Sequence, residues 1–215
     1  MTALAEADLV AGVHFAWVDE DIVVLDLRSD AYILITGASA LLQPVRNGGG
    51  VCGAAAVVDD LVTAGLAART NRLWRTPLPR AVSDIRLPGD APPLAALSAL
   101  AHALAATAAF KRQNLAALVE IARRRRSLAR PHDLAEAVRQ AGAFEAVRPW
   151  VPFEGDCLQR SWMLHDRLCN RGVDAAWVFG VRTWPFFAHC WVQVRDVVVG
   201  DTLNRVGGFT PIMAV

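Results

Sequence analysis

The sequence has no marked excess of charge of either sign. Its 215 residues carry 22 Lys and Arg against 21 Asp and Glu, which gives a formal net charge of +1. Attraction to a polyanion through bulk charge needs a basic excess, so nucleic acid is not an expected partner. The basic run over residues 123–126 is typical of a solvated helix end, where the helix dipole favours cations.

Cysteine is also scarce, and no signal peptide is predicted. The first residues lack the basic stretch that opens a secretory signal. The thiols form neither a dense disulfide framework nor a Cys-x-x-Cys pair. They are Cys52, Cys157, Cys169 and Cys190. We therefore expect a cytoplasmic protein whose thiols are reduced and either buried or reactive.

Apolar residues, by contrast, make up 54% of the chain, and the mean hydropathy is +0.30. Residues 91–110 contain no Asp, Glu, Lys or Arg, and their number matches a membrane span. The segment is rich in alanine and includes His102 and Thr107, so a buried helix is the stronger interpretation and membrane insertion is not expected. We predict one helix over residues 94–125, buried along a leucine face. The leucines of that face are Leu97, Leu100, Leu104, Leu115 and Leu118.

The first 68 residues have the pattern of a small α+β unit. Residues 13–35 contain three β-branched and aromatic runs separated by polar turns, which predict an antiparallel three-stranded sheet. A helix is expected from Thr36 to about Arg46, where a glycine run stops it, and a second over residues 53–64. We assign residues 1–68 to one domain.

A proline-rich segment separates this unit from the rest of the chain. Residues 69–93 contain five prolines, which disfavour regular structure and indicate a linker. In the second predicted domain, residues 94–215, a helix is expected over residues 157–171. The three strands expected after it cover residues 174–181, 186–195 and 197–201. The whole chain is therefore predicted to be α+β.

Three residues of the second domain are spaced as a thiol enzyme requires. Cys157 opens a predicted helix, where free N–H groups and the helix dipole lower a thiol pKa and offer an oxyanion donor. A tight turn at residues 195–196 pairs His189 with a position next to Asp201. Asp201 can then orient the imidazole, which can activate the thiol. Any one of these residues taken alone is more typical of a protein core.

Zinc binding is the competing chemistry. His165 and Cys169 are one helical turn apart, and Cys190 follows His189, so a Cys/His tetrad is arithmetically available. Neighbouring strand residues point to opposite faces, so His189 and Cys190 should not both ligate. We therefore predict no metal site. Cys169 and Cys190 are expected to be core thiols, with Cys190 pointing away from Cys157.

At this point the second half resembles a known family, the leader peptidases of lasso-peptide biosynthesis, which are transglutaminase-like (papain-like) cysteine proteases. The matching motifs are Cys-Leu-Gln-Arg-Ser at 157–161, Gly-Val at 172–173, Val-Phe-Gly-Val at 178–181 and Pro-Phe-Phe-Ala-His-Cys-Trp-Val at 185–192, followed by Asp201. The family more usually has Ala at the position of Cys190, so this residue departs from the pattern.

The first domain is similar to the small precursor-recognition domain related to the pyrroloquinoline-quinone chaperone. The similarity lies in residues 25–34 and 36–42, and it implies a winged-helix-like domain with a three-stranded sheet and helices. The family's leader peptide adds as a strand beside the third strand, against the last helix. The positions that match these contacts are Tyr32, Ile33, Leu34, Leu61 and Val62.

Together, the two resemblances imply a peptidase that binds the leader of a ribosomally made precursor and cuts it from the core. Cys157 would be the nucleophile, His189 the proton donor and Asp201 its support. The resemblance also implies an ATP-dependent, asparagine-synthetase-like cyclase as partner. This chain has no Walker A loop, so ATP would act through the cyclase and no cofactor is expected here. An acyltransferase or amidase on the same fold, and a non-catalytic peptide-binding scaffold, stay open as alternatives.

Overall fold

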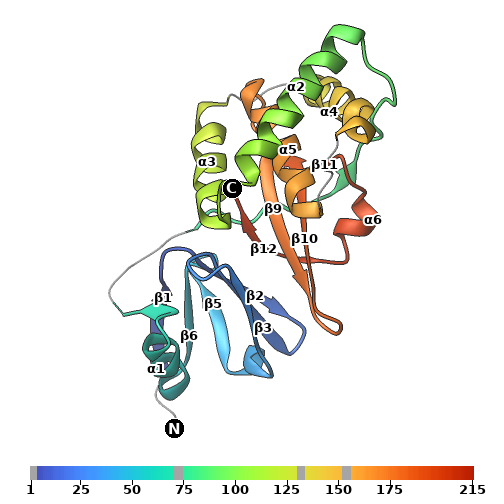
Figure 1. Cartoon of the computed structure of the whole chain (residues 1–215). Helices are drawn as coiled ribbons and strands as arrows, with labels where there is room; N and C mark the ends of the chain where they lie inside the picture. Colours follow the sequence, from blue (N-terminus) through green and yellow to red (C-terminus); the bar gives the residue numbers. More distant parts are fainter. Residues whose placement is uncertain (1–3, 70–74, 130–133, 152–155) are drawn as a thin grey trace. The chain divides into compact units, whose positions relative to one another are not determined.

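The structure, a computed structural model, describes residues 4–69, 75–129, 134–151 and 156–215 (Figure 1). The chain divides into two compact units. The first comprises residues 1–78 with 181–187 and 210–212, and the second comprises residues 79–180, 188–209 and 213–215. Both helices and sheets are present, which confirms the predicted α+β class.

The first unit contains the predicted three-stranded sheet. Strands β2 (Val13–Val18), β3 (Asp21–Asp26) and β4 (Ala31–Ile35) pair antiparallel in chain order, which makes β4 an outer strand. Asp19 and Asp30 lie in the tight connections with φ of 53° and 52°. Aspartate tolerates this left-handed backbone better than most residues, which explains the two turns.

A second sheet was not predicted. It has four strands in the order β5-β6-β1-β7. Their bounds are β1 (Leu4–Leu9), β5 (Leu42–Val45), β6 (Gly50–Ala54) and β7 (Ala67–Ala68). The helix expected over residues 36–46 is therefore wrong: a short 3-10 turn, η1 (Ala38–Ala40), precedes β5. Arg46, Asn47 and Gly48 all have positive φ and turn β5 back onto β6, so the glycine run belongs to a hairpin and does not stop a helix.

The second predicted helix is confirmed as α1 (Ala55–Thr63), which packs against strands of the four-stranded sheet. Both sheets and α1 contribute to one apolar core, in which Leu9, Ile22, Leu42 and Val58 are fully buried. The described part of this unit thus has two sheets and one α-helix, where one sheet and two helices were expected. A winged-helix-like arrangement is not confirmed.

The second unit contains five α-helices among the described residues. They are α2 (Pro93–Phe110), α3 (Leu115–Leu128), α4 (Leu134–Val147), α5 (Cys157–Asn170) and the short α6 (Leu203–Val206), with a 3-10 turn η2 (Arg148–Trp150). The single helix expected over residues 94–125 is wrong, because the chain turns between α2 and α3. The Asn114 side chain accepts a hydrogen bond from the N–H of Ala117 at 2.9 Å and caps α3.

The buried face of α2 consists of alanines. Ala99, Ala103 and Ala106 are buried, whereas Leu97 and Leu104 are 65% and 44% exposed. The predicted leucine face is therefore wrong for α2, although Leu115 and Leu118 of α3 are buried as expected. Small side chains let α2 approach α4 and α5 closely, and this packing places the leucines outside.

Among the described residues, α2 is the one helix whose length and composition would allow it to cross a membrane. Two of its polar side chains are nevertheless bonded to α5. His102 lies 3.2 Å from Asp166, and the Thr107 hydroxyl donates to the Met163 sulfur at 3.2 Å. These contacts are those of a helix packed inside a protein.

A five-stranded sheet underlies the helices, in the order β12-β9-β10-β11-β8. Its strands are β8 (Ser83–Asp84), β9 (Ala176–Arg182), β10 (Phe187–Val194), β11 (Val197–Val199) and β12 (Thr210–Ala214). The three strands predicted over residues 174–201 are confirmed. Strand β8 comes from the predicted linker, of which residues 70–74 lie outside the described ones, and β12 and α6 were not predicted.

Replacing Asn114 with Ala should lower the free energy of unfolding by about 1 kcal/mol, because the first turn of α3 loses its cap. Chemical denaturation of the full chain measures the change. Gln113→Ala is the matched control, since Gln113 is exposed and its side chain does not cap the helix. Equal stability of the two variants would contradict the assigned helix boundary.

Candidate active site

Cys157 is the first residue of α5. The carboxylate of Asp156 caps this helix by accepting hydrogen bonds from the N–H groups of Leu158 (3.1 Å) and Gln159 (3.3 Å). The Cys157 thiol therefore lies at the positive end of a 14-residue helix, where a thiolate is favoured.

His189 and Asp201 meet through the β10–β11 hairpin. In this hairpin Val194 pairs with Val197 and Val192 with Val199, which is the register that the two-residue turn predicts. Continued past the end of β11, it brings Asp201 to His189, and Nε2 of His189 lies 2.7 Å from Oδ2 of Asp201. The other oxygen of Asp201 accepts the N–H of Thr202 at 2.8 Å, which fixes the carboxylate.

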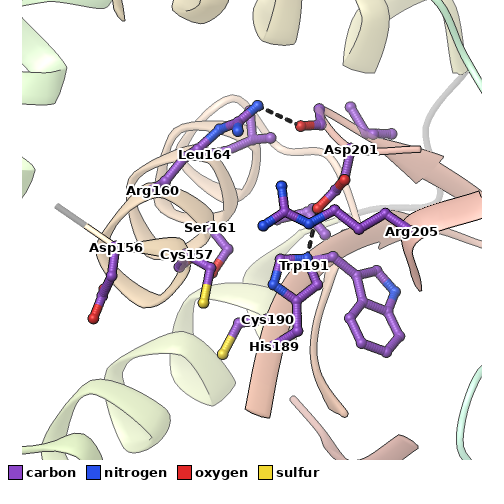
Figure 2. Close-up of a pocket in the computed structure, with 13 residues that line it drawn as sticks. Asp156, Cys157, Arg160, Ser161, Leu164, His189, Cys190, Trp191, Asp201 and Arg205 are labelled. Carbon is purple, nitrogen blue, oxygen red and sulfur yellow. Dashed lines mark hydrogen bonds and ion pairs between the residues drawn. The ribbon is translucent and has the colours of Figure 1, made fainter. Parts of the chain in front are cut away.

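The imidazole of His189 joins Asp201 to Cys157. Because Nε2 faces Asp201, the remaining nitrogen Nδ1 is the one available to Cys157, and a hydrogen bond links the two side chains. Figure 2 shows the ring between the sulfur of Cys157 and the carboxylate. The rings of Trp191 and Phe209 lie beside it, with centroids 6.1 and 5.2 Å away, and hold its orientation. The structure thus brings the three predicted residues together.

Cys190 also belongs to this site, which corrects the prediction that it points away. Its thiol and its backbone N–H both hydrogen-bond Cys157. Strand β11 pairs with β10 only over Val192–Val194. Cys157 therefore interacts with two consecutive residues of β10, His189 and Cys190, in the part of the strand that β11 does not pair. The alternation rule fails because it assumes a partner above one face.

The site stabilises a thiolate. Hydrogen bonds from Cys190 and His189 lower the pKa of Cys157 to about 4, although burial opposes them. Burial alone would lower the pKa of His189, but its bonds to Asp201 and Cys157 outweigh burial and raise it. Both shifts favour a thiolate on Cys157 beside a protonated imidazole on His189. Its bond to Cys157, together with burial, raises the pKa of Cys190 well above the usual value, so Cys190 stays a thiol.

Two further residues of the Cys-Leu-Gln-Arg-Ser motif position the site, which sequence reasoning missed. Arg160 donates to the carbonyl of Gly200 at 2.7 Å and to Glu145 at 3.2 Å, so it ties α5 to the loop that carries Asp201. Ser161 donates to the carbonyl of Cys157 at 2.7 Å and accepts the indole N–H of Trp177 at 2.8 Å. The sequence signal that could have identified Arg160 and Ser161 is their place in the motif at residues 157–161.

Cys157, His189, Cys190 and Asp201 line one pocket with a volume of about 140 Å³. A wider hollow of about 580 Å³ lies next to it and shares Arg160 and Arg205 among its lining residues. Residues 85–89, from the predicted linker, form one wall of this hollow. The half-buried nucleophile therefore lies in a small pocket, and the adjoining hollow is large enough for a short stretch of peptide.

The zinc tetrad is not assembled. Sγ of Cys169 lies 3.4 Å from Nε2 of His165, and this pair is separate from His189 and Cys190, which bond Cys157. In the described part of the chain, no group of three or more His, Cys, Asp or Glu residues is placed to hold a metal ion.

The positions assigned to the leader peptide lie in the first unit. Tyr32, Ile33 and Leu34 are in the outer strand β4, where Ile33 is 41% exposed and the other two are half-buried. On α1, Val62 is partly buried, whereas Leu61 belongs to the core. Leu61 therefore supports the fold from inside, and Val62 is the more accessible of the two.

Comparison with known proteins gives two matches. The Microcin J25-processing protein McjB of Escherichia coli is 46% identical over 52 residues, which are 24% of this chain and 25% of that protein. The matched part thus spans about a quarter of this relative. No solved structure matches the chain.

The second match concerns most of the second unit. The profile of the Transglutaminase-like superfamily matches residues 94–214, more than half of the chain. The matched region contains the helix that begins at Cys157, strand β10 with both His189 and Cys190, and Asp201. This chain therefore belongs to the transglutaminase-like superfamily.

Proposed function

We propose that this protein is a cysteine peptidase that removes the leader from a ribosomally made lasso-peptide precursor. The observation that carries the proposal is the hydrogen-bonded series Cys157–His189–Asp201, with a thiolate at a helix N-terminus inside a pocket. Membership of the transglutaminase-like superfamily and the likeness to a microcin J25-processing protein support it. The processing of a lasso peptide as the context comes from the second of these, the likeness to the microcin J25-processing protein.

In the first chemical step, the Cys157 thiolate attacks the carbonyl carbon of the last leader residue. The negative charge that develops on the carbonyl oxygen is stabilised by the N–H of Cys157 at the start of α5. His189, already protonated, gives its Nδ1 proton to the departing amine of the core peptide. This leaves the leader as a thioester on Cys157.

In the second step, water hydrolyses the thioester. His189 is now neutral and accepts a proton from the attacking water, and the leader leaves with a new carboxylate. Asp201 keeps Nε2 of His189 fixed at 2.7 Å throughout, so Nδ1 stays aimed at the sulfur and the reacting atoms. The mechanism needs no metal and no cofactor held by this chain.

The leader would bind to the first unit by adding a strand to β4. An outer strand offers main-chain groups to an extended peptide, and exposed Ile33 and half-buried Leu34 offer apolar contacts. Val62, which is partly buried on α1, would be a further contact, although α1 packs against β1, β6 and β7 of the other sheet. The first domain, residues 1–68, would thus recognise the leader, and the second domain, residues 94–215, would cleave it from the core. The segment 69–93 would link the two domains.

We further propose that the protein works in the cytoplasm with an ATP-dependent, asparagine-synthetase-like cyclase. Cleavage frees the core N-terminus, and closing a macrolactam on that amine needs an activated carboxylate. ATP is the ordinary source of such activation, so an ATP-using partner follows from the chemistry of the product. Neither nucleic acid nor a membrane is needed for this reaction.

Cys157→Ala should abolish leader removal while the precursor still binds, because only the nucleophile is lost. The substrate is a synthetic candidate precursor, chosen from any short reading frames that sequencing finds next to the gene, and mass spectrometry follows its cleavage. The expected fall in rate is at least roughly 10⁴-fold. Cys52→Ala, which removes a thiol from the first unit, is the control and should cleave normally.

The products of the same assay separate the alternatives. A peptidase releases a leader with a free carboxylate, whereas an acyltransferase or amidase given an amine leaves the leader as an amide. A non-catalytic scaffold would bind the peptide and leave it intact. Cleavage by Cys157→Ala at the wild-type rate would refute the assignment of the nucleophile.

Alkylation of Cys157 by iodoacetamide should hardly change between about pH 6 and pH 8, whereas an ordinary thiol of pKa ~8.5 slows about a hundredfold over that range. The reason is that Cys157, with a pKa of about 4, is already a thiolate at both values. Peptide mapping measures the rate for each cysteine. Cys190→Ala removes the hydrogen bond that lowers the pKa of Cys157 most. In this variant the alkylation rate of Cys157 should therefore fall as the pH is lowered. A wild-type rate that rises steadily with pH would exclude the thiolate.

Ile33→Glu should weaken leader binding by about tenfold or more, since burying an isoleucine contributes about 1.5–3 kcal/mol. Fluorescence anisotropy of the labelled precursor peptide gives the Kd. Leu41→Glu is the matched control, because Leu41 is 52% exposed in the same unit and lies outside β4. Equal Kd values for the two variants would remove β4 as the leader site.

A further inference from the structure

Cys190 has no step in the proposed reaction, yet its sulfur is hydrogen-bonded to the sulfur of the nucleophile. Figure 2 shows both sulfur atoms in one pocket, each carried by a different element. Cys157 belongs to helix α5 and Cys190 to strand β10, so each sulfur is held by a different element of the fold. Two thiols held in contact in this way can be joined without unfolding.

We propose that Cys157 and Cys190 form a reversible disulfide when the protein meets a peroxide, and that this bond switches the site off. The geometry supports it because both cysteines line one pocket and their sulfur atoms lie on the same side of the His189 ring (Figure 2), so a local approach of the two sulfurs can form an S–S bond of ~2.05 Å. The pocket of about 140 Å³ admits an oxidant as small as hydrogen peroxide.

The reaction takes two balanced steps. The Cys157 thiolate attacks one oxygen of hydrogen peroxide and breaks the O–O bond. The imidazolium of His189 protonates the departing hydroxide, which gives Cys157 sulfenic acid and water. The Cys190 sulfur then attacks the sulfenic sulfur, and its proton leaves with the hydroxyl as a second water. Two thiols are oxidised and one peroxide is reduced. A dithiol restores both thiols by exchange and is itself oxidised to a disulfide.

The other cysteines are not placed for this role. Cys169 is buried against His165 on α5 and does not line the pocket that holds Cys157. Cys52 lies in β6 of the first unit and does not line the pocket. Cys190 is thus the thiol placed to resolve a sulfenic acid on Cys157 before further peroxide oxidises it irreversibly to the sulfinic acid.

The test uses the full chain, reduced, desalted and treated with hydrogen peroxide. Arginines separate all four cysteines into different tryptic peptides. Wild-type protein should lose two hydrogen atoms in intact mass and yield a peptide pair linked through Cys157 and Cys190. Dithiothreitol should restore full alkylation of Cys157. These readouts are masses and do not depend on peptidase activity. The disulfide can therefore be tested even if the proposed peptidase function is wrong.

Cys190→Ser is the decisive variant, since serine keeps a hydrogen-bond donor beside Cys157 but cannot form a disulfide. Its Cys157 should react with dimedone as sulfenic acid and pass to the sulfinic acid, which dithiothreitol does not reverse. Cys52→Ala should behave as wild type. A dimedone-reactive Cys157 without a cross-link in wild-type protein would overturn the proposal, and so would a cross-link from Cys157 to any other cysteine or to a second chain.

Discussion

The contact between the first turn of α5 and the middle of β10 is the interaction on which the site depends. Cys157 has a low pKa only because β10 delivers His189 and Cys190 to the helix N-terminus. The rings of Trp162 and Trp177, with centroids 5.5 Å apart, press the helix onto the sheet, and the Trp177–Ser161 hydrogen bond sets its register. A shift of α5 by about an ångström would break this arrangement while leaving the fold in place.

A buried carboxylate holds the other helices to α5. The carboxylate of Asp166 contacts His102 of α2 and forms an ion pair with Arg125 of α3. It also accepts a hydrogen bond from the side chain of Asn170, within α5 itself. Removing one partner from such a group leaves a buried charge without compensation, so the three helices are tied together. This network accounts for the alanine-rich composition of α2: its backbone must come close enough for His102 to reach Asp166, and larger side chains on that face would hold it away.

The sequence was most informative where short-range rules decide the structure. The turn at residues 195–196 fixes the register of β10 and β11, and the two-residue period of a strand then carries Asp201 to His189. It was least informative where the same residues serve two structures. Glycines after Arg46 can end a helix or form the turn of a hairpin equally well. The leucine spacing continues past Asn114, so it conceals the helix cap that this residue forms. Cys190 was misplaced because side-chain alternation gives the strand face of a residue and does not say where the start of α5, with Cys157, lies relative to the strand.

The position of Cys190 also shows why activation and protection of the nucleophile are physically linked in this chain. Its thiol stabilises the Cys157 thiolate by donating a hydrogen bond, which requires the two sulfurs to lie near each other in one pocket. The same contact places a resolving thiol next to the sulfur that peroxide attacks first. An alanine at this position would remove both properties at once. A serine would keep the first and lose the second, so the two can be separated only by changing the chemistry of the donor atom, and not by changing the geometry of the site.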